Sequence, residues 1–379
     1  MTQRDEIIKL GTFEEFCRIS SDWDLIANQY VHKAPFLCHG WFEIWVKHFA
    51  TEQDLCIFTL TKEDGFIAIV PCIKKNDKYR GIVLDKYELM GNAYSPIRSL
   101  IFDPAMTEQA VEKFFSNFAE QRNLSWDILD LSSLPEESPF FECIRKYLMM
   151  HNFHFSEYLS FGDWYQDGIT CSGGDYLAGL PEKIQKDFQY CKRRLEREGK
   201  LEFRVVTSIE HLESYLDRYY EVYGRSWQKQ ERLGPTFHRD LARMAVLKGW
   251  LRLAFLYFND IPLAAQFWIV SGGTAYILKT VYDQEYKKYS PGKILTSEMF
   301  KYVIDVDKVT TIDYVQGDED YKKYWTPKRR ERRGILVYND TLRGRYCSIV
   351  DRKIVPLMNS NEYLKKLKKS VSRRGRSSK

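Results

Sequence analysis

Apolar residues recur with a helical period in the middle of the chain. Ile184, Phe188, Cys191 and Leu195 follow one another at intervals of three and four residues within residues 180–200. Side chains at this spacing lie on one face of an α-helix. Many of the polar residues between them are lysine or arginine, so the pattern predicts an amphipathic helix with a basic outer face.

Shorter apolar or alternating segments bounded by turn residues predict strands, and the two halves of the chain show the same order of elements. In the first half we expect a helix, a hairpin of two strands, a helix, a short strand, a helix and a strand, at residues 12–28, 55–61, 66–73, 106–122, 127–131, 140–150 and 153–159. In the second half we expect a helix, three strands joined by tight turns, a helix, a strand, a short helix and a strand, at residues 209–224, 251–257, 263–270, 275–282, 292–304, 311–315, 319–325 and 335–338. This repetition predicts an α/β protein in which one fold occurs twice.

Residues 162–179 separate the two halves. Their sequence, GDWYQDGITCSGGDYLAG, is rich in glycine, aspartate and serine, which favour turns. A chain of 379 residues also suits two domains of ordinary size. We therefore expect domains at residues 1–165 and 166–345, followed by a C-terminal extension at 346–379 that ends in a basic, disordered tail.

The charge distribution distinguishes the halves. Residues 1–165 hold 16 basic and 25 acidic side chains, whereas residues 166–379 hold 41 and 27. Residues 364–379 contain eight basic side chains and no acidic one. A basic half attracts phosphate, nucleic acid, anionic lipid or acidic glycan, and charge alone does not select among them.

Other features narrow the class of protein. The eight cysteines lie far apart and form no CxxC pair, so neither a disulfide scaffold nor a zinc module is expected. The sequence has no apolar run long enough to span a bilayer and no signal peptide at its start. We expect a cytoplasmic protein without a metal site, whose basic tail could contact an anionic membrane.

The most informative segment for chemistry is the start of the helix predicted after residue 290. Ser290, Pro291 and Gly292 stand in its first turn, where backbone N–H groups have no partner within the helix and bind anions. Lys287 and Lys293 add positive charge beside it. An ordinary helix cap surrounded by solvated lysines would show the same local pattern.

Several stretches resemble one family of enzymes. They are residues 34–49, 126–134, 181–203, 226–229, 262–295 and 313–334, which read APFLCHGWFEIWVKHF, WDILDLSSL, PEKIQKDFQYCKRRLEREGKLEF, SWQK, PLAAQFWIVSGGTAYILKTVYDQEYKKYSPGKIL and DYVQGDEDYKKYWTPKRRERRG. These stretches resemble the CelD/BcsL-like acetyltransferases of the GNAT superfamily, relatives of the FemABX aminoacyltransferases. The resemblance implies tandem GNAT-like domains, each with a mixed, mostly antiparallel sheet flanked by helices. It also implies a degenerate first domain and an active second domain.

The resemblance implies candidate site residues in the second half. An acyl-CoA donor would lie against the strand and helix start formed by Leu278, Thr280, Val281, Lys287, Lys288, Tyr289, Ser290, Gly292 and Lys293. The acceptor would contact Trp227, Gln266, Lys279 and Tyr282. Lys322 would stabilise the oxyanion and Asp313 would orient or deprotonate the acceptor. Two ordinary structural roles remain open, a hydrogen bond in the core for Gln266 and an exposed pair with Asp318 for Lys322.

The expected function is acyl transfer from acyl-CoA, such as acetyl-CoA, to an amine or hydroxyl of a sugar, polysaccharide precursor or lipid-linked intermediate, by direct attack. The aligned phosphate loop, KKYSPG, keeps only the final glycine of the usual GNAT loop, and Pro291 removes an amide donor. An aminoacyltransferase that uses aminoacyl-tRNA is therefore one alternative. A second is an inactive GNAT-like protein that binds anionic membranes or polyanions through its basic helix and tail.

Overall fold

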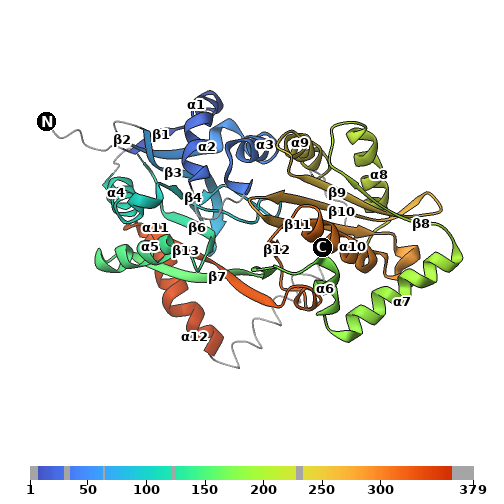
Figure 1. The fold of residues 1–379 in the computed structure, drawn as a ribbon. Coiled ribbons are helices and arrows are strands. Elements are labelled where there is room, and N and C mark those ends of the chain that lie inside the picture. Colours follow the sequence, from blue (N-terminus) through green and yellow to red (C-terminus); the bar gives the residue numbers. More distant parts are fainter. Residues whose placement is uncertain (1–6, 30–34, 63–64, 121–123, 228–233, 361–379) are drawn as a thin grey trace.

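The computed structural model describes residues 7–29, 35–62, 65–120, 124–227 and 234–360. In these residues, thirteen strands form one mixed sheet that runs through both halves of the chain (Figure 1). The strand order is β1-β2-β3-β4-β6-β13-β7-β12-β11-β10-β9-β8, with β5 paired to β3. The predicted fold class, an α/β protein with mixed sheet flanked by helices, is confirmed.

The first half supplies the strands from β1 to β7 and five helices. Its elements are β1 (Ile7–Leu10), α1 (Phe13–Arg18), α2 (Ser20–Asn28), η1 (Pro35–Leu37), α3 (His39–Phe49), η2 (Glu52–Asp54), β2 (Leu55–Lys62), β3 (Gly65–Tyr79), β4 (Ile82–Leu89), β5 (Ile101–Phe102), η3 (Pro104–Met106), α4 (Thr107–Glu120), β6 (Ile128–Pro135), α5 (Pro139–Met150) and β7 (His154–Gln166).

The second half supplies the remaining strands and the helices from α6 onward. Its elements are α6 (Gly173–Ala178), α7 (Glu182–Glu198), β8 (Leu201–Val206), α8 (Leu212–Gly224), α9 (Gly234–Leu247), β9 (Leu251–Phe258), β10 (Ile261–Ser271), β11 (Thr274–Tyr282), η4 (Gln284–Tyr289), α10 (Pro291–Asp305), β12 (Thr311–Asp313), η5 (Lys322–Tyr324), β13 (Lys328–Tyr338), α11 (Leu342–Ile349), η6 (Val350–Ile354) and α12 (Val355–Ser360).

Most of the predicted elements are present, with differences that have physical causes. The predicted helix at 12–28 divides at Ile19 into α1 and α2, and Thr12 with Glu15 forms the expected capping box. Strand β3 continues past its predicted end at residue 73 because its polar residues pair with β4, which the sequence did not predict. Helix α9 was also not predicted.

The last strand of each half pairs with the other half. Strand β13 lies between β6 and β7 and pairs antiparallel with both, and Ile312 of β12 pairs with Gln166 at the end of β7. Residues 328–338 are thus built into the sheet of the first half. The predicted division at residues 165 and 166 falls at the end of β7 and stays a prediction.

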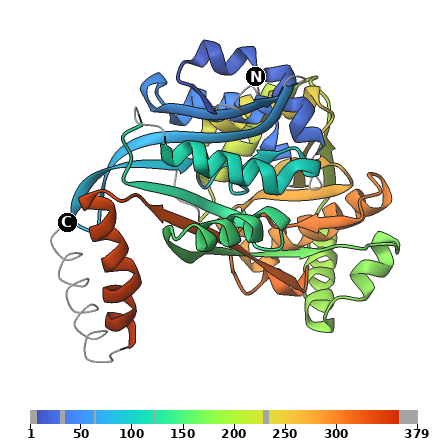
Figure 2. The ribbon, with the colours of Figure 1, turned by 90° about the vertical axis from the view of Figure 1, so that its left-hand side faces the viewer.

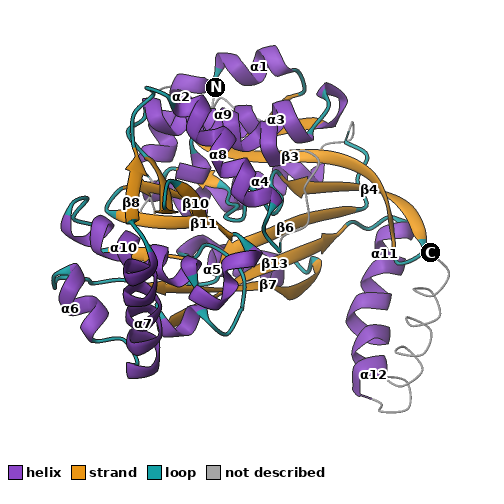
Figure 3. Ribbon diagram, turned by 90° about the vertical axis from the view of Figure 1, so that its right-hand side faces the viewer, coloured by secondary structure: helices purple, strands orange, loops and turns teal. Residues whose placement is uncertain are grey.

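Helices cover both faces of the sheet (Figure 3). Helices α1, α2, α3, α8 and α9 share one face, where a single core joins Ile57 and Ile69 of the first half to Phe255 and Phe267 of the second. Phe36 and Tyr276 meet in this core with ring centroids 5.2 Å apart. On the other face, α4 and α5 cover the first half and α7 and α10 the second. The two halves therefore share a core as well as a sheet.

The C-terminal extension begins with helix. Residues 342–360 run through α11, η6 and α12, while residues 361–379, which include the tail predicted to be disordered, lie outside the described residues. None of the described helices is long and apolar enough to cross a membrane.

A buried charge cluster lies where β7, β12 and β13 meet. Arg330 donates to the carboxylates of Asp163 and Asp313, and Arg332 lies 3.2 Å from Asp163. Asp163 is fully buried, and this burial, together with the neighbouring Asp313, raises the pKa of Asp163 to about 7. The cluster joins strands from both halves at the point where β13 of the second half enters the sheet of the first half.

Replacing Arg330 by alanine should destabilise the fold by about 3–5 kcal/mol, because two buried carboxylates would lose their shared cation. The loss should be larger at pH 8 than at pH 5, since at pH 5 the carboxyl group of Asp163 binds a proton and no longer repels Asp313. Urea unfolding at both pH values measures it. Lys328→Ala, on the same strand but paired with the half-exposed Asp167, is the control and should cost about 1 kcal/mol or less. Equal losses for both variants would contradict this account.

Candidate active site

The site begins where two parallel strands separate. Strands β11 and β12 pair only from Thr274 to Tyr276 and from Thr311 to Asp313 within the described chain. Beyond this point β11 stays paired with β10 as far as Tyr282, while the chain after β12 turns away through Val315, whose φ of 65° lies in the left-handed region. No described strand pairs with residues 277–282 on this side of β11, which we call the open edge of β11.

A β-bulge interrupts β11 at this edge. Phe267 of β10 pairs with Lys279 and Trp268 pairs with Ile277, so Leu278 is the extra residue. A bulge redirects backbone groups and side chains beside it and is common next to active sites. Here it lies on the segment that faces the gap between β11 and β12.

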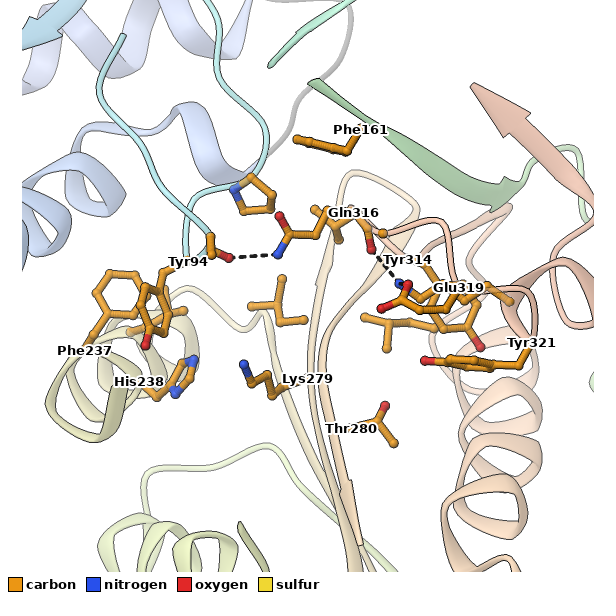
Figure 4. Close-up of a pocket in the computed structure, with 18 of the residues that line it drawn as sticks. Tyr94, Phe161, Phe237, His238, Lys279, Thr280, Tyr314, Gln316, Glu319 and Tyr321 are labelled. Atoms are coloured by element: carbon orange, nitrogen blue, oxygen red, sulfur yellow. Dashed lines mark hydrogen bonds and ion pairs between the residues drawn. The ribbon is translucent and has the colours of Figure 1, made fainter. Parts of the chain in front are cut away.

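A cavity of about 390 Å³ occupies the gap and extends to the first half (Figure 4). Its walls come from β11, from the loop after β12, from α9, from the loop before β5 and from two further aromatic residues: Ile277, Leu278, Lys279, Thr280, Tyr314, Val315, Gln316, Gly317, Glu319, Tyr321, Lys322, Phe237, His238, Leu241, Ala93, Tyr94, Pro96, Phe161 and Trp227. This volume is within the range of small-molecule sites.

Lys322 is fixed in the cavity wall. Its Nζ donates to the backbone oxygen of Gln316 at 2.5 Å and pairs with Glu319 at 2.7 Å, and its side chain is only 8% exposed. The Gln316 side chain in turn donates to the backbone oxygen of Ala93 at 3.0 Å (Figure 4). Asp318, the partner that an exposed pair would have used, binds Arg329 instead.

The opposite wall carries a histidine that the sequence did not indicate. His238 of α9 is 5% exposed, its Nδ1 lies 3.2 Å from the hydroxyl of Tyr220, and Figure 4 shows it in the same part of the cavity as Lys279. No motif surrounds it, and the helix that carries it was not predicted. It is the histidine of the cavity lining.

Tyr321 lies on the same wall as Lys322. Partial burial, together with the Glu319 carboxylate, raises the pKa of Tyr321 to about 12. Its hydroxyl therefore keeps its proton at neutral pH and can donate a hydrogen bond.

The start of α10 lies beside the open edge of β11. A Cβ atom on Gly292 would stand 3.2 Å from the ring of Tyr282 and 3.8 Å from the methyl group of Thr280, so a larger residue would crowd the strand. Ser290 adopts a left-handed conformation with φ of 48°. The helix start and the cavity are thus neighbours along one strand.

Some of the cations near this helix start form ion pairs, and others are exposed to solvent. Lys293 pairs with Asp187, whereas Lys287 and Lys288 are exposed. Tyr289 is buried, donates its hydroxyl to Glu198 at 2.5 Å and lies under the Arg194 guanidinium. The segment before α10 is thus a structured 3₁₀ helix.

Five of the predicted site residues line the cavity, namely Trp227, Leu278, Lys279, Thr280 and Lys322. The others lie outside its lining: Gln266, Val281, Tyr282, Lys287, Lys288, Tyr289, Ser290, Gly292, Lys293 and Asp313. Val281 is fully buried in the core.

Asp313 and Gln266 make structural contacts. One oxygen of Asp313 accepts from the N–H of Val315 at 2.6 Å, and the other accepts from Arg330. The fully buried Gln266 accepts from the indole of Trp268 and donates to Thr296, both at 2.8 Å. The residue thus ties β10 to α10, as its structural alternative required.

In the described residues, no group of three or more histidine, cysteine, aspartate or glutamate side chains is arranged to hold a metal ion.

Comparison with known proteins agrees with this geometry. The family model described as "Acetyltransferase (GNAT) domain" matches residues 182–323, which contain the open strand, the helix start and Lys322. This part of the chain is similar to a GNAT acetyltransferase domain. The match confirms the predicted enzyme class, acyltransferase, whereas the finer resemblance to the CelD/BcsL-like family stays a prediction. No curated protein matches the chain in sequence.

Solved structures share the fold at low sequence identity. A crystal structure of FemX has a TM-score of 0.58 and 10% identity, covering 83% of this chain and 95% of that one. A C-terminal domain of a putative lysylphosphatidylglycerol synthetase from Agrobacterium fabrum has a TM-score of 0.53 and 11% identity, covering 88% and 97%. A tandem GNAT protein from the clavulanic acid biosynthesis pathway has a TM-score of 0.50 and 12% identity, covering 89% and 99%. The likeness is one of tandem GNAT architecture.

Replacing Gln266 by leucine should lower the free energy of unfolding by about 1–3 kcal/mol, because Trp268 and Thr296 would lose buried partners. Chemical denaturation measures the loss. Adding Trp268→Phe removes the stranded indole N–H, so the double variant should lose less than the sum of the single variants. A Gln266→Leu protein as stable as the wild type would contradict a structural role.

Proposed function

We propose that the chain transfers an acyl group from an acyl-CoA such as acetyl-CoA to an amine or hydroxyl of a sugar-type acceptor, free, in a polysaccharide precursor or lipid-linked. The observation that carries the proposal is the open edge of β11, which runs from the cavity to the start of α10. An extended donor lying along this edge would place its acyl end at the bulge and its phosphates near Gly292. Backbone amides at a helix start favour phosphate.

The cavity suits an acceptor with both apolar and polar faces. Tyr94, Phe237 and Tyr314 offer aromatic surface, while Gln316 and Glu319 offer hydrogen-bonding groups. A sugar ring packs its C–H face on aromatic rings and binds polar side chains through its hydroxyls. Because Tyr94 belongs to the first half, both halves would contribute to acceptor binding.

The reaction that we propose is a direct attack. The acceptor nitrogen or oxygen forms a bond to the thioester carbon while His238 takes its proton, and the carbonyl oxygen becomes an oxyanion. The N–H groups of the open β11 edge and the charge of Lys322 stabilise that oxyanion. When the carbon–sulfur bond breaks, Tyr321 supplies a proton to the thiolate. Asp313 supports the loop of Val315 from outside the cavity.

One feature favours a second donor class, aminoacyl-tRNA. Pro291 has no N–H, and the N–H of Ser290 bonds to the oxygen of Lys287, so the turn offers fewer amides than a usual coenzyme A loop. The basic second half would attract the tRNA backbone. Donor identity is therefore the first point to test.

Calorimetric titration with acetyl-CoA should show saturable binding at one site per chain. Mixing the protein with acetyl-CoA and amino sugars should then release free thiol in an acceptor-dependent way. Failure to bind acetyl-CoA and longer acyl-CoAs would contradict the proposal. Tight binding of aminoacyl-tRNA that weakens steeply with salt would support the second donor class instead.

Replacing Lys322 by alanine should lower kcat about 100-fold or more, because the oxyanion would lose a fixed positive charge. Thiol release under saturating donor measures the change, and Lys322→Arg should restore part of the rate. The matched control is Lys323→Ala, since this neighbour is exposed and pairs with the exposed Asp320. Full turnover by Lys322→Ala would exclude a catalytic role for this lysine.

A further inference from the structure

The C-terminal helical segment, residues 342–360 (α11, η6 and α12), forms a rod that stands out from the body of the molecule (Figure 2, Figure 3). Its inner face is anchored where α11 leaves the sheet. Cys347 is fully buried against β6 and β13, and Asp351 accepts hydrogen bonds from Tyr79 at 2.8 Å and Tyr338 at 2.7 Å. Arg80 also pairs with Asp351 at 2.6 Å. The rod is therefore held in one orientation.

Large apolar residues lie on the outward face of this rod. Leu342 is 87% exposed, Ile349 52% and Ile354 43%. The rod's inner residues are anchored, so these side chains are not needed for its attachment to the sheet. An exposed apolar patch that is rimmed by polar residues marks a site that binds a protein or a membrane.

Cations surround the same face. A cavity of about 610 Å³ beside Ile349 is lined by Arg345, Arg352, Lys353, His154 and Asp340, among others. Arg345 forms a two-point pair with Asp340, and Arg352 lies 3.0 Å from Nδ1 of His154. Within the part of the chain that the structure describes, neither Arg352 nor Lys353 forms an ion pair with a carboxylate. The cavity thus offers uncompensated positive charge.

The chain continues from this rod into more positive charge. Nineteen residues follow Ser360, and the last sixteen of them hold eight basic side chains and no acidic one. Each basic residue near an anionic membrane surface contributes about 1 kcal/mol of attraction. A negatively charged partner of the rod therefore also matches the charge of the sequence that follows it.

We propose that the C-terminal rod binds the surface of an anionic phospholipid membrane. Leu342, Ile349 and Ile354 enter the boundary between headgroups and acyl chains, and the cavity with Arg352 and Lys353 receives lipid phosphate. Apolar groups flanked by arginine and lysine match such a surface. A symmetric pairing of two copies through this face would instead bring the same cations together.

This docking surface would hold the proposed enzyme at a membrane, which is a property separate from its chemistry. It does not depend on the donor or on any residue of the catalytic cavity. Sedimentation of the full-length protein with large vesicles tests it, using phosphatidylcholine alone and phosphatidylcholine containing phosphatidylglycerol. Binding should require phosphatidylglycerol and should weaken when salt is raised.

Two sets of variants of the full-length protein separate the contributions. Ile349→Asp combined with Leu342→Asp should weaken vesicle binding about tenfold or more, because two inserted aliphatic side chains would be lost. Arg352→Ala combined with Lys353→Ala should weaken it severalfold and reduce its salt dependence. Leu25→Asp, on the exposed surface of α2, is the control and should bind like the wild type. Circular dichroism establishes that each variant is folded.

Four outcomes would overturn the proposal. They are no binding to phosphatidylglycerol vesicles, equal binding to both kinds of vesicle, wild-type binding by both sets of variants, and a dimer in light scattering that the Ile349 and Leu342 substitutions dissociate. Wild-type binding by the variants would assign the attraction to residues 361–379 alone. Dissociation of a dimer would assign the apolar face to a second copy.

Discussion

The exchange of strands between the two halves is the constraint on which the rest of the structure depends. Strand β13 is hydrogen-bonded on one edge to β6 and on the other to β7, and the end of β7 pairs antiparallel with β12 of the second half. Arg330 joins Asp163 of β7 to Asp313 of β12 at this crossing. The loop after Asp313 forms a wall of the cavity, so the crossing also fixes the position of Lys322 relative to β11.

The first half contains a pair of parallel strands that separate as β11 and β12 do at the active site, but a side chain occupies the gap between them. Strands β4 and β6 pair in parallel only from Lys86 to Glu88, as β11 and β12 do at the active site. Beyond that pairing, Arg98 donates to Ser132 at 2.5 Å and approaches the backbone oxygen of Leu89 at 3.5 Å. Its guanidinium lies in the first half at the position that corresponds to the gap beside β11.

Local sequence patterns predicted the elements whose structure depends only on their own residues. The turns at Asn259-Asp260 and Gly272-Gly273 have positive φ and join β9, β10 and β11 as expected. The polar part of β3 that pairs with β4 has no hydrophobic alternation, so no local pattern indicated this pairing. His238 could not be found either, because its position depends on α9 packing against α3 across the halves.

The residues of the candidate active site were predicted only in part, because some of their contacts come from distant parts of the chain. The family resemblance implied Lys279 and Lys322 as site residues, and both line the cavity. It implied Asp313 as well, but a buried carboxylate also arises wherever a buried arginine needs a partner, and here that arginine is Arg330. The partner comes from β13, whose place between β6 and β7 no local pattern reveals.

The place of β13 also sets an order of events during synthesis. Residues 328–338 complete the sheet of the first half, yet they leave the ribosome only after residues 1–327. Until then, the facing edges of β6 and β7 lack the strand that separates them, and unpaired strand edges promote aggregation. A nascent chain of this protein therefore carries an unfinished first half through most of its translation, and chaperones have their longest opportunity to bind it there.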